Sequence, residues 1–179
     1  MKSNKLMSVI VIVIIVAVVA GGGYYAYHYE TTGKLKVSAA DAPLNLTGVL
    51  DVNVTFSAIA LHSDKASSNS TGWTNYSLHD KTVNIMNLNA SNAAFLSNLS
   101  VYAGSYNMMK IYIKNVSIDM LNIGSITLHL SHAFALVIFV HPLTVAAHTT
   151  TSMVTDFNLS SDMHLSSKTF TMSASVVIN

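Results

Sequence analysis

Histidine is the residue type in this sequence that could most readily carry metal chemistry. His129, His132 and His141 lie close together along the chain, and imidazole nitrogens are common ligands of zinc and copper. In an extended strand, however, a spacing of three places two side chains on opposite faces. The chain has no cysteine, which excludes the usual blue-copper thiolate site. We therefore expect no metal site and no cofactor, and histidines that are exposed or cap other elements.

Catalytic motifs are also missing from the sequence. It contains no Gly-x-Ser-x-Gly, no phosphate-binding Gly-Lys-Ser/Thr and no His-Glu-x-x-His, the patterns that serve nucleophilic, phosphate and zinc chemistry. Asp41 and Asp156 could form a distant acid pair, but an aspartate before Ala42-Pro43 is better explained as a turn former. We expect a protein that is not an enzyme and has no catalytic residues.

Asparagine is the residue type with the clearest chemical pattern, because eight of the fifteen asparagines begin an Asn-x-Ser/Thr triplet. This is the acceptor signal for N-glycosylation in exported proteins. An alternative is that a surface rich in Ser, Thr and Asn produces such triplets by composition. The predicted glycosylation sites are Asn45, Asn53, Asn69, Asn75, Asn89, Asn98, Asn115 and Asn158.

Charge is sparse and balanced. The chain has nine lysines, no arginine and eight acidic residues, for a net charge of +1. Binding to nucleic acid requires clustered cations that neutralise phosphates, so we expect no nucleic-acid partner. Without cysteines, an exported domain must fold without disulfides.

The N-terminal segment predicts a membrane location. Lys2 and Lys5 precede an apolar run from Leu6 to Ala20, and tyrosines follow at residues 24–29. A helix over residues 6–27 would be about 33 Å long, enough to cross a hydrocarbon core of about 30 Å. The lysines and the tyrosine belt predict a cytoplasmic N-terminus and an extracellular C-terminal domain. A cleavable secretory signal, cut near Ala20, is the alternative.

Beyond residue 33, apolar and polar residues alternate in the manner of strands with one buried face. The predicted inward positions are Leu35, Val37 and Ala39; Leu50, Val52, Val54, Phe56 and Ala58; Ile126, Leu128 and Leu130; and Phe170, Met172, Ala174, Val176 and Ile178.

Three segments depart from simple alternation. Residues 133–140 are apolar at every position, which predicts a strand covered on both faces. Between Met109 and Met120 the apolar phase shifts by one residue at Lys114 or Asn115, as a β-bulge would cause. Residues 89–99 could form a short helix capped by Asn89 or Ser91.

Turn signals at intervals complete the prediction of an all-β fold. They lie at residues 41–43, 63–72, 103–105, 123–124 and 141–142. We expect one antiparallel β-sandwich of eight or nine strands preceded by a single N-terminal helix. The predicted organisation is a membrane anchor or signal at 1–27, a short linker at 28–33 and an extracellular domain at 34–179.

Several motifs resemble a known prokaryotic surface family, domain of unknown function 4382. They are the strand ending in Asp41-Ala42-Pro43, the lone Trp73 after a Ser/Asn-rich loop, Ala103-Gly104-Ser105-Tyr106 before a strand, and Leu143-Thr144-Val145 followed by Thr149-Thr150-Thr151 and Asp156-Phe157. The resemblance covers residues 33–179. His148 departs from it, because we expect a glycine in the turn before the threonines. The resemblance implies an exported β-sandwich, with an archaeal source, and no established activity.

Two functional classes follow from these observations. The first is a membrane-tethered, glycosylated surface protein with a structural, adhesive or ligand-capturing role, whose partners are copies of itself or other cell-envelope proteins. The second is a filament subunit: after signal cleavage, residues 21–37 would form a tail that pairs with a sheet edge of the next subunit, with Leu35, Val37 and Ala39 on one face. A sugar- or metal-binding module is a weaker third class.

Overall fold

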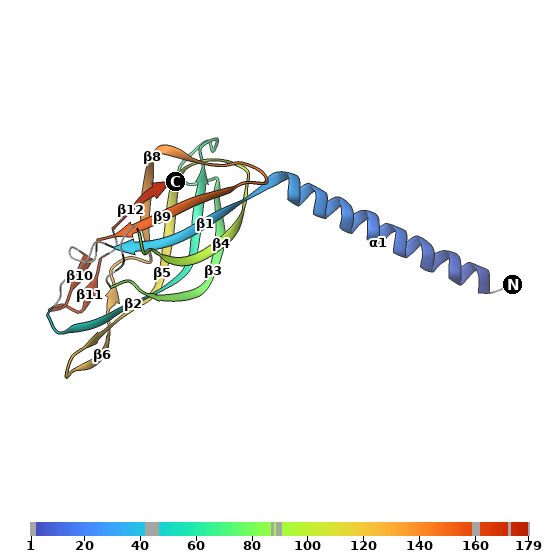
Figure 1. Cartoon of the computed structure of the whole chain (residues 1–179). Coiled ribbons are helices and arrows are strands. Elements are labelled where there is room, and N and C mark those ends of the chain that lie inside the picture. Colours follow the sequence, from blue (N-terminus) through green and yellow to red (C-terminus); the bar gives the residue numbers. More distant parts are fainter. Residues whose placement is uncertain are drawn as a thin grey trace.

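The computed structural model describes residues 3–41, 47–86, 88, 91–158, 162–171 and 173–178. It consists of a β-sandwich and one long helix, α1 (Ser3–Thr31), that extends away from it (Figure 1). β1 begins at Thr32, directly after α1. The side chains described in α1 are those of residues 13–27 and of Thr31. Among the described residues, no helix is both long enough and apolar enough to cross a membrane.

Two sheets form the sandwich, and a small third sheet lies beside them (Figure 1). The first has the order β12 (Ala174–Ile178), β9 (Thr150–Phe157), β1 (Thr32–Asp41), β4 (Ala94–Tyr102). The second has the order β3 (Trp73–Asn84), β2 (Val49–Ser63), β5 (Gly104–Met120), β6 (Gly124–Thr127), and β8 (Phe134–Val145) also pairs with β5. The third comprises β10 (Met163–His164), β11 (Thr169–Phe170) and β7 (His129–Leu130).

The predicted all-β sandwich is confirmed, with twelve strands in the described residues rather than eight or nine. Most pairs are antiparallel, but β1 pairs parallel with β9 and β11 pairs parallel with β7. The core lies between the inward faces of the two sheets. Phe56 of β2 and Phe157 of β9 meet there, with ring centroids 5.4 Å apart, and both are buried.

The predicted inward faces are largely confirmed. Leu35, Val37 and Ala39 are fully buried in β1 between β4 and β9. Because these residues already pair on both sides, they are not available as a donor strand in this structure, contrary to our filament hypothesis. In β2, Val52, Val54 and Phe56 are buried, but Leu50 is exposed near the beginning of the strand. A register shift between Phe56 and Ala58 then transfers the buried face to Ile59 and Leu61.

The β-bulge predicted in residues 109–120 is confirmed and lies at Lys114. Thr55 pairs with Asn115 while the next residue, Phe56, pairs with Ile113, so Lys114 is the extra residue of β5. Ile113 and Val116 on either side of the bulge are both buried. The bulge thus keeps both halves of the strand facing the core although their sequence phases differ.

Three local predictions were wrong. Residues 94–99 belong to strand β4, in which Leu96 and Leu99 are buried, and do not form a helix; Asn89 lies outside the described residues. The predicted strand from Phe170 to Ile178 is split between β11 and β12, which belong to different sheets. His141-Pro142 does not form a turn but continues β8. In the first two cases pairing with a distant strand prevails over the local signal. His141-Pro142 lies where the register between β8 and β5 shifts.

The prediction that residues 133–140 are covered on both faces was also wrong. Ala135 and Val137 face the core and are buried, but Leu136, Ile138 and Val140 are 49%, 69% and 92% exposed. One face of β8 therefore remains open to solvent in this structure.

Candidate interaction surfaces

The described asparagines of the glycosylation triplets lie at the surface. Asn69, Asn75, Asn98 and Asn158 are exposed, and Asn53 and Asn115 are half-buried. Asn53 and Asn115 alternate with buried valines in β2 and β5, so they lie on the outer face of their sheet. The Asn53 amide nitrogen donates a hydrogen bond to Asp119 at 3.5 Å. Asn45 and Asn89 lie outside the described residues.

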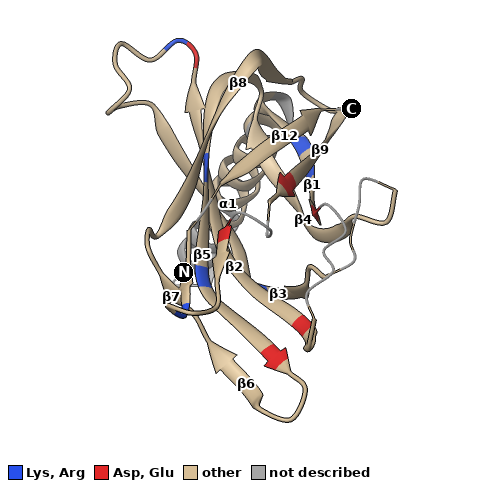
Figure 2. Ribbon diagram, turned by 90° about the vertical axis from the view of Figure 1, so that its left-hand side faces the viewer, with Lys and Arg blue, Asp and Glu red and all other residues tan. Residues whose placement is uncertain are grey.

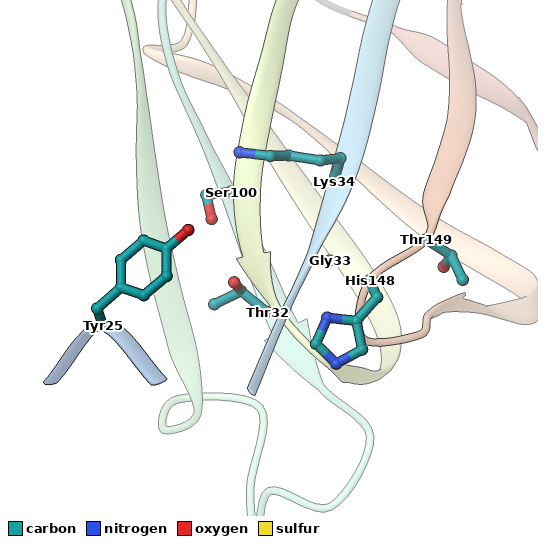
Figure 3. Close-up of a pocket in the computed structure, with 7 residues that line it drawn as sticks. All are labelled: Tyr25, Thr32, Gly33, Lys34, Ser100, His148 and Thr149. Carbon is teal, nitrogen blue, oxygen red and sulfur yellow. The ribbon is translucent and has the colours of Figure 1, made fainter. Parts of the chain in front are cut away.

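A polar pocket of about 460 Å³ lies where α1 joins the sandwich (Figure 3). Tyr25 comes from α1, Lys34 from β1, Ser100 from β4, and His148 and Thr149 from the turn between β8 and β9. Among the described side chains, hydroxyl groups, one ammonium and one imidazole line the pocket.

The turn beside this pocket depends on close backbone contact with β1. The amide of Lys34 donates to the carbonyl of Thr149 at 2.7 Å, and the amide of His148 donates to Thr32 at 3.1 Å. A Cβ atom added to Gly33 would lie 2.2 Å from the carbonyl oxygen of Ala146, so only glycine lets the turn approach this closely. His148 has a φ of 62°, in the left-handed region that favours glycine. The glycine that we expected at this position would adopt this conformation without strain.

A second cluster surrounds His62 on the outer face of β2. His62 is buried, its Nδ1 lies 2.7 Å from Asn107 Oδ1, and its Nε2 lies 3.0 Å from the carbonyl oxygen of Ser68. Its ring contacts Trp73, whose Nε1 donates to the carbonyl of Asn69 at 2.8 Å. These contacts hold the loop at residues 63–72 against the sheet. The role of His62 is therefore structural, which its sequence position did not indicate.

The remaining described histidines do not come together. No group of three His, Asp or Glu side chains that could hold a metal ion lies in the described part of the chain. Exposed side chains at the surface include His129, His132 and His141. Asp41 pairs with Phe157 while Asp156 pairs with Ala40, so the two aspartates point to opposite faces of the sheet.

Tyrosines close the side of the sandwich where edge strands β3 and β4 meet. The hydroxyl of Tyr106 donates to the carbonyl of Tyr102 at 2.6 Å, and the amide of Tyr102 donates to the hydroxyl of Tyr76 at 3.4 Å. Burial raises the pKa of Tyr76 and of Tyr106 above the ordinary value, because the phenolate is poorly solvated there.

The opposite side of the sandwich, between edge strands β8 and β12, is open. A groove of about 620 Å³ runs between residues 136–142 of β8 and residues 174–178 of β12. In the described part of the chain, no strand pairs with the outer edge of either strand. Exposed apolar side chains line it, among them Ile138, Val140 and Val177. Charged residues are few over the whole fold, and β8 and β12 carry none (Figure 2).

These features define an all-β, sandwich-like protein. The chain belongs to the family described as Domain of unknown function (DUF4382), which it matches over residues 32–173. This confirms the resemblance that the motifs indicated.

Other comparisons are distant. No curated protein matches this chain. Its fold is similar to that of a fimbrial protein from Bacteroides vulgatus ATCC 8482, with a TM-score of 0.39 and 11% sequence identity. The similarity covers 83% of this chain and 53% of the fimbrial protein, so the chain spans about half of that protein's length. A likeness this distant assigns no function.

Proposed function

We propose that this chain is a membrane-tethered, N-glycosylated surface protein with a structural or adhesive role and no catalytic activity. The observation that carries the proposal is the exposure of α1. Val13, Ile14, Ile15 and Val16 are consecutive, so they occupy all sides of the helix, and they are 55–61% exposed. Exposed apolar surface of this extent is unfavourable in water and favours insertion into lipid.

The sequence adds the rest of the membrane segment. Residues 6–12 extend the apolar run upstream of the described side chains. At the other end, Tyr24, Tyr25 and Tyr27 are exposed, which suits an aromatic belt at the membrane surface. With lysines at the N-terminal end, this order supports a cytoplasmic N-terminus and an extracellular sandwich.

Glycosylation of the sandwich is supported by the position of the acceptor triplets. Four of the acceptor asparagines are exposed, namely Asn69, Asn75, Asn98 and Asn158. A glycan attached to any of them would require no rearrangement of the fold. Asn53 is less accessible than these four, since it is half-buried and its amide nitrogen donates a hydrogen bond to Asp119. We expect occupancy at Asn75 and little or none at Asn53.

Mass spectrometry of the protein from native membranes tests the tether. A peptide that contains residues 6–20 is expected in the mature chain, together with resistance to extraction by alkaline carbonate. A mature chain that starts near Gly21 would overturn the tether and show that the N-terminal segment is a cleaved secretory signal. Peptide mapping of the same sample measures glycan occupancy at Asn75 and Asn53, and an unmodified Asn75 would contradict the glycoprotein proposal.

A further inference from the structure

We propose that the N-glycan at Asn75 packs on the outer face of the second sheet. Its first sugar ring contacts the indole of Trp73 and accepts a hydrogen bond from the Lys110 ammonium. The glycan is then a structural part of the sandwich and does not extend freely into solvent. This contact rests on the proposed glycosylation and adds to it a binding site for the sugar on the protein itself.

Trp73 and Asn75 lie two residues apart on β3, so their side chains point to the same side of the sheet. Tyr76, the next residue, packs against the core, which places Trp73 and Asn75 on the outer face. Two residues of a strand span about 7 Å, a distance that a sugar linked through the asparagine side chain can bridge. In the described part of the chain, β3 pairs on one side only, and Asn75 is exposed. There is therefore room for a glycan beside the indole.

The indole of Trp73 is held in one orientation. Its Nε1 donates a hydrogen bond to the carbonyl of Asn69 at 2.8 Å, and its ring lies against that of His62, with centroids 4.9 Å apart. His62 is fixed in turn by Asn107 and by the carbonyl of Ser68. Trp73 is half-buried, so part of its ring remains accessible. A sugar presents C–H groups that stack on an aromatic face, and a face fixed in advance loses little entropy on contact.

Lys110 supplies the polar part of the site. Ala60 of β2 pairs with Asn75 on one side and with Lys110 on the other, so one small side chain separates the two residues on this face. The Lys110 ammonium lies 4.2 Å from the centroid of the Trp73 ring. Among the described residues it forms no ion pair. An ammonium group has three donors, which can bind the hydroxyl or carbonyl oxygens of a sugar above the indole.

The chain's own glycan is favoured over a free saccharide as the occupant. A sugar linked to Asn75 is held beside Trp73 by its covalent bond, so the contact is intramolecular and its effective concentration is high. The Asn75 side chain forms no hydrogen bond to the described residues, and a glycan there displaces none. The exposed acceptor Asn98 of β4 lacks this arrangement, because the residue two positions before it is the buried Leu96.

The test uses the full-length glycosylated chain, purified from native membranes in mild detergent. Trp73 is the one tryptophan of the chain, so quenching of its fluorescence by acrylamide measures access to this ring alone. Asn75→Gln removes the acceptor and no hydrogen bond of the described fold. We expect its quenching constant to rise about twofold and its Tm to fall by about 2–4 °C, because the ring loses its cover and the fold loses one contact.

Asn98→Gln is the matched control, since it removes the glycan of an exposed acceptor in the other sheet. Its Trp73 quenching should equal that of the wild type. The coupling between ring and sugar is measured in a Trp73→Leu background by circular dichroism. There, Asn75→Gln should leave the Tm unchanged, because the sugar has already lost its partner. Should Trp73→Leu fail to fold, the quenching measurement decides, because it needs only the native tryptophan.

Peptide mapping of the same samples gives the occupancy of Asn75 and separates two failures. An occupied Asn75 with equal quenching in the wild type and in Asn75→Gln would overturn the contact and leave the glycoprotein proposal standing. An unmodified Asn75 would overturn both. Equal changes in Asn75→Gln and Asn98→Gln would also overturn the contact. So would free N-acetylglucosamine that lowers the quenching of the wild type, because the ring would then be open to an external saccharide.

Discussion

Gly33 is a position where one added methyl group should destabilise the fold. It is a buried residue of β1, packed beneath the turn between β8 and β9. An added Cβ would lie 2.2 Å from the carbonyl oxygen of Ala146 and 2.8 Å from Cγ1 of Val145. The nearer atom belongs to the backbone, so it cannot turn aside as the end of a long side chain can. Gly33→Ala must therefore displace the turn.

The expected loss of stability follows from two opposing contributions. Overpacking of a well-packed site costs about 1–3 kcal/mol. We use the upper half of this range, because the clash at Gly33 is with a backbone atom. Replacing glycine by alanine restores about 0.4–1 kcal/mol through the lower entropy of the unfolded chain. We expect a net loss of about 2 kcal/mol, which lowers the Tm by about 4–8 °C for a protein of this size. The hydrogen bonds from Lys34 and His148 to the facing backbone should lengthen with the displaced turn.

Fluorescence of Trp73, the one tryptophan of the chain, reports thermal unfolding of the full-length protein in detergent. Gly104→Ala is the matched control, because a Cβ at Gly104 would meet no atom within 4 Å. Its Tm should stay the same or rise slightly. The reasoning is refuted if Gly33→Ala unfolds at the wild-type temperature, or if Gly104→Ala is destabilised as much.

Three further predictions concern backbone conformation, the β-bulge and pH. His148→Gly should stabilise the fold by about 0.5–1 kcal/mol, since a left-handed conformation costs an L-residue about 1–2 kcal/mol and the added chain entropy offsets part of the gain; an unchanged Tm would contradict this. Deleting Lys114 should cost less than about 3 kcal/mol, because Ile113, Asn115 and Val116 then alternate as in a regular strand and keep their faces. Deleting Ser117 should cost more than about 4 kcal/mol, because Ile118 then changes face; denaturant unfolding that shows equal losses for the two deletions would refute the bulge. Lys114→Ala should cost less than about 1 kcal/mol, because its 2.6 Å ion pair with Asp80 is exposed. Burial raises the folded-state pKa of Tyr76 and Tyr106 above the unfolded value of 10.0. The contribution of these two tyrosines to the free energy of unfolding is therefore fully present below pH 10. It is lost as the pH rises from 10 toward the folded-state pKa. The Tm should therefore decline above about pH 10, and the Tm of Tyr106→Phe should decline less steeply. A wild-type Tm that does not change above about pH 10 would contradict this prediction.

Local sequence pattern predicted those parts of the fold in which one strand has one buried face. The alternation around Leu35 and Val37 and the change of phase near Lys114 both appear in the structure as predicted. These predictions succeed because the period of two in an extended strand depends on the backbone alone. The helix predicted around Ala93 failed, because that segment pairs with β1, and pairing with a distant strand leaves little trace in the local sequence.

The interaction surfaces could be predicted only in part. The acceptor asparagines are visible as triplets, and the outward position of Asn53 and Asn115 follows from alternation. The structural role of His62 required the approach of Asn107 from β5 and of the loop that contains Ser68. The open groove required knowledge of which strands lie at the sheet edges.

The amino-acid sequence by itself determined the class of fold, the family, the faces of most strands and the apolar N-terminal segment, because composition and periodicity are properties of consecutive residues. Tertiary structure alone decided which strands pair, which edges stay open, and that the second apolar face of β8 is left uncovered. Those outcomes depend on contacts between residues far apart in the chain, such as Lys34 with Thr149, and alternation specifies the face of a strand without specifying its neighbour.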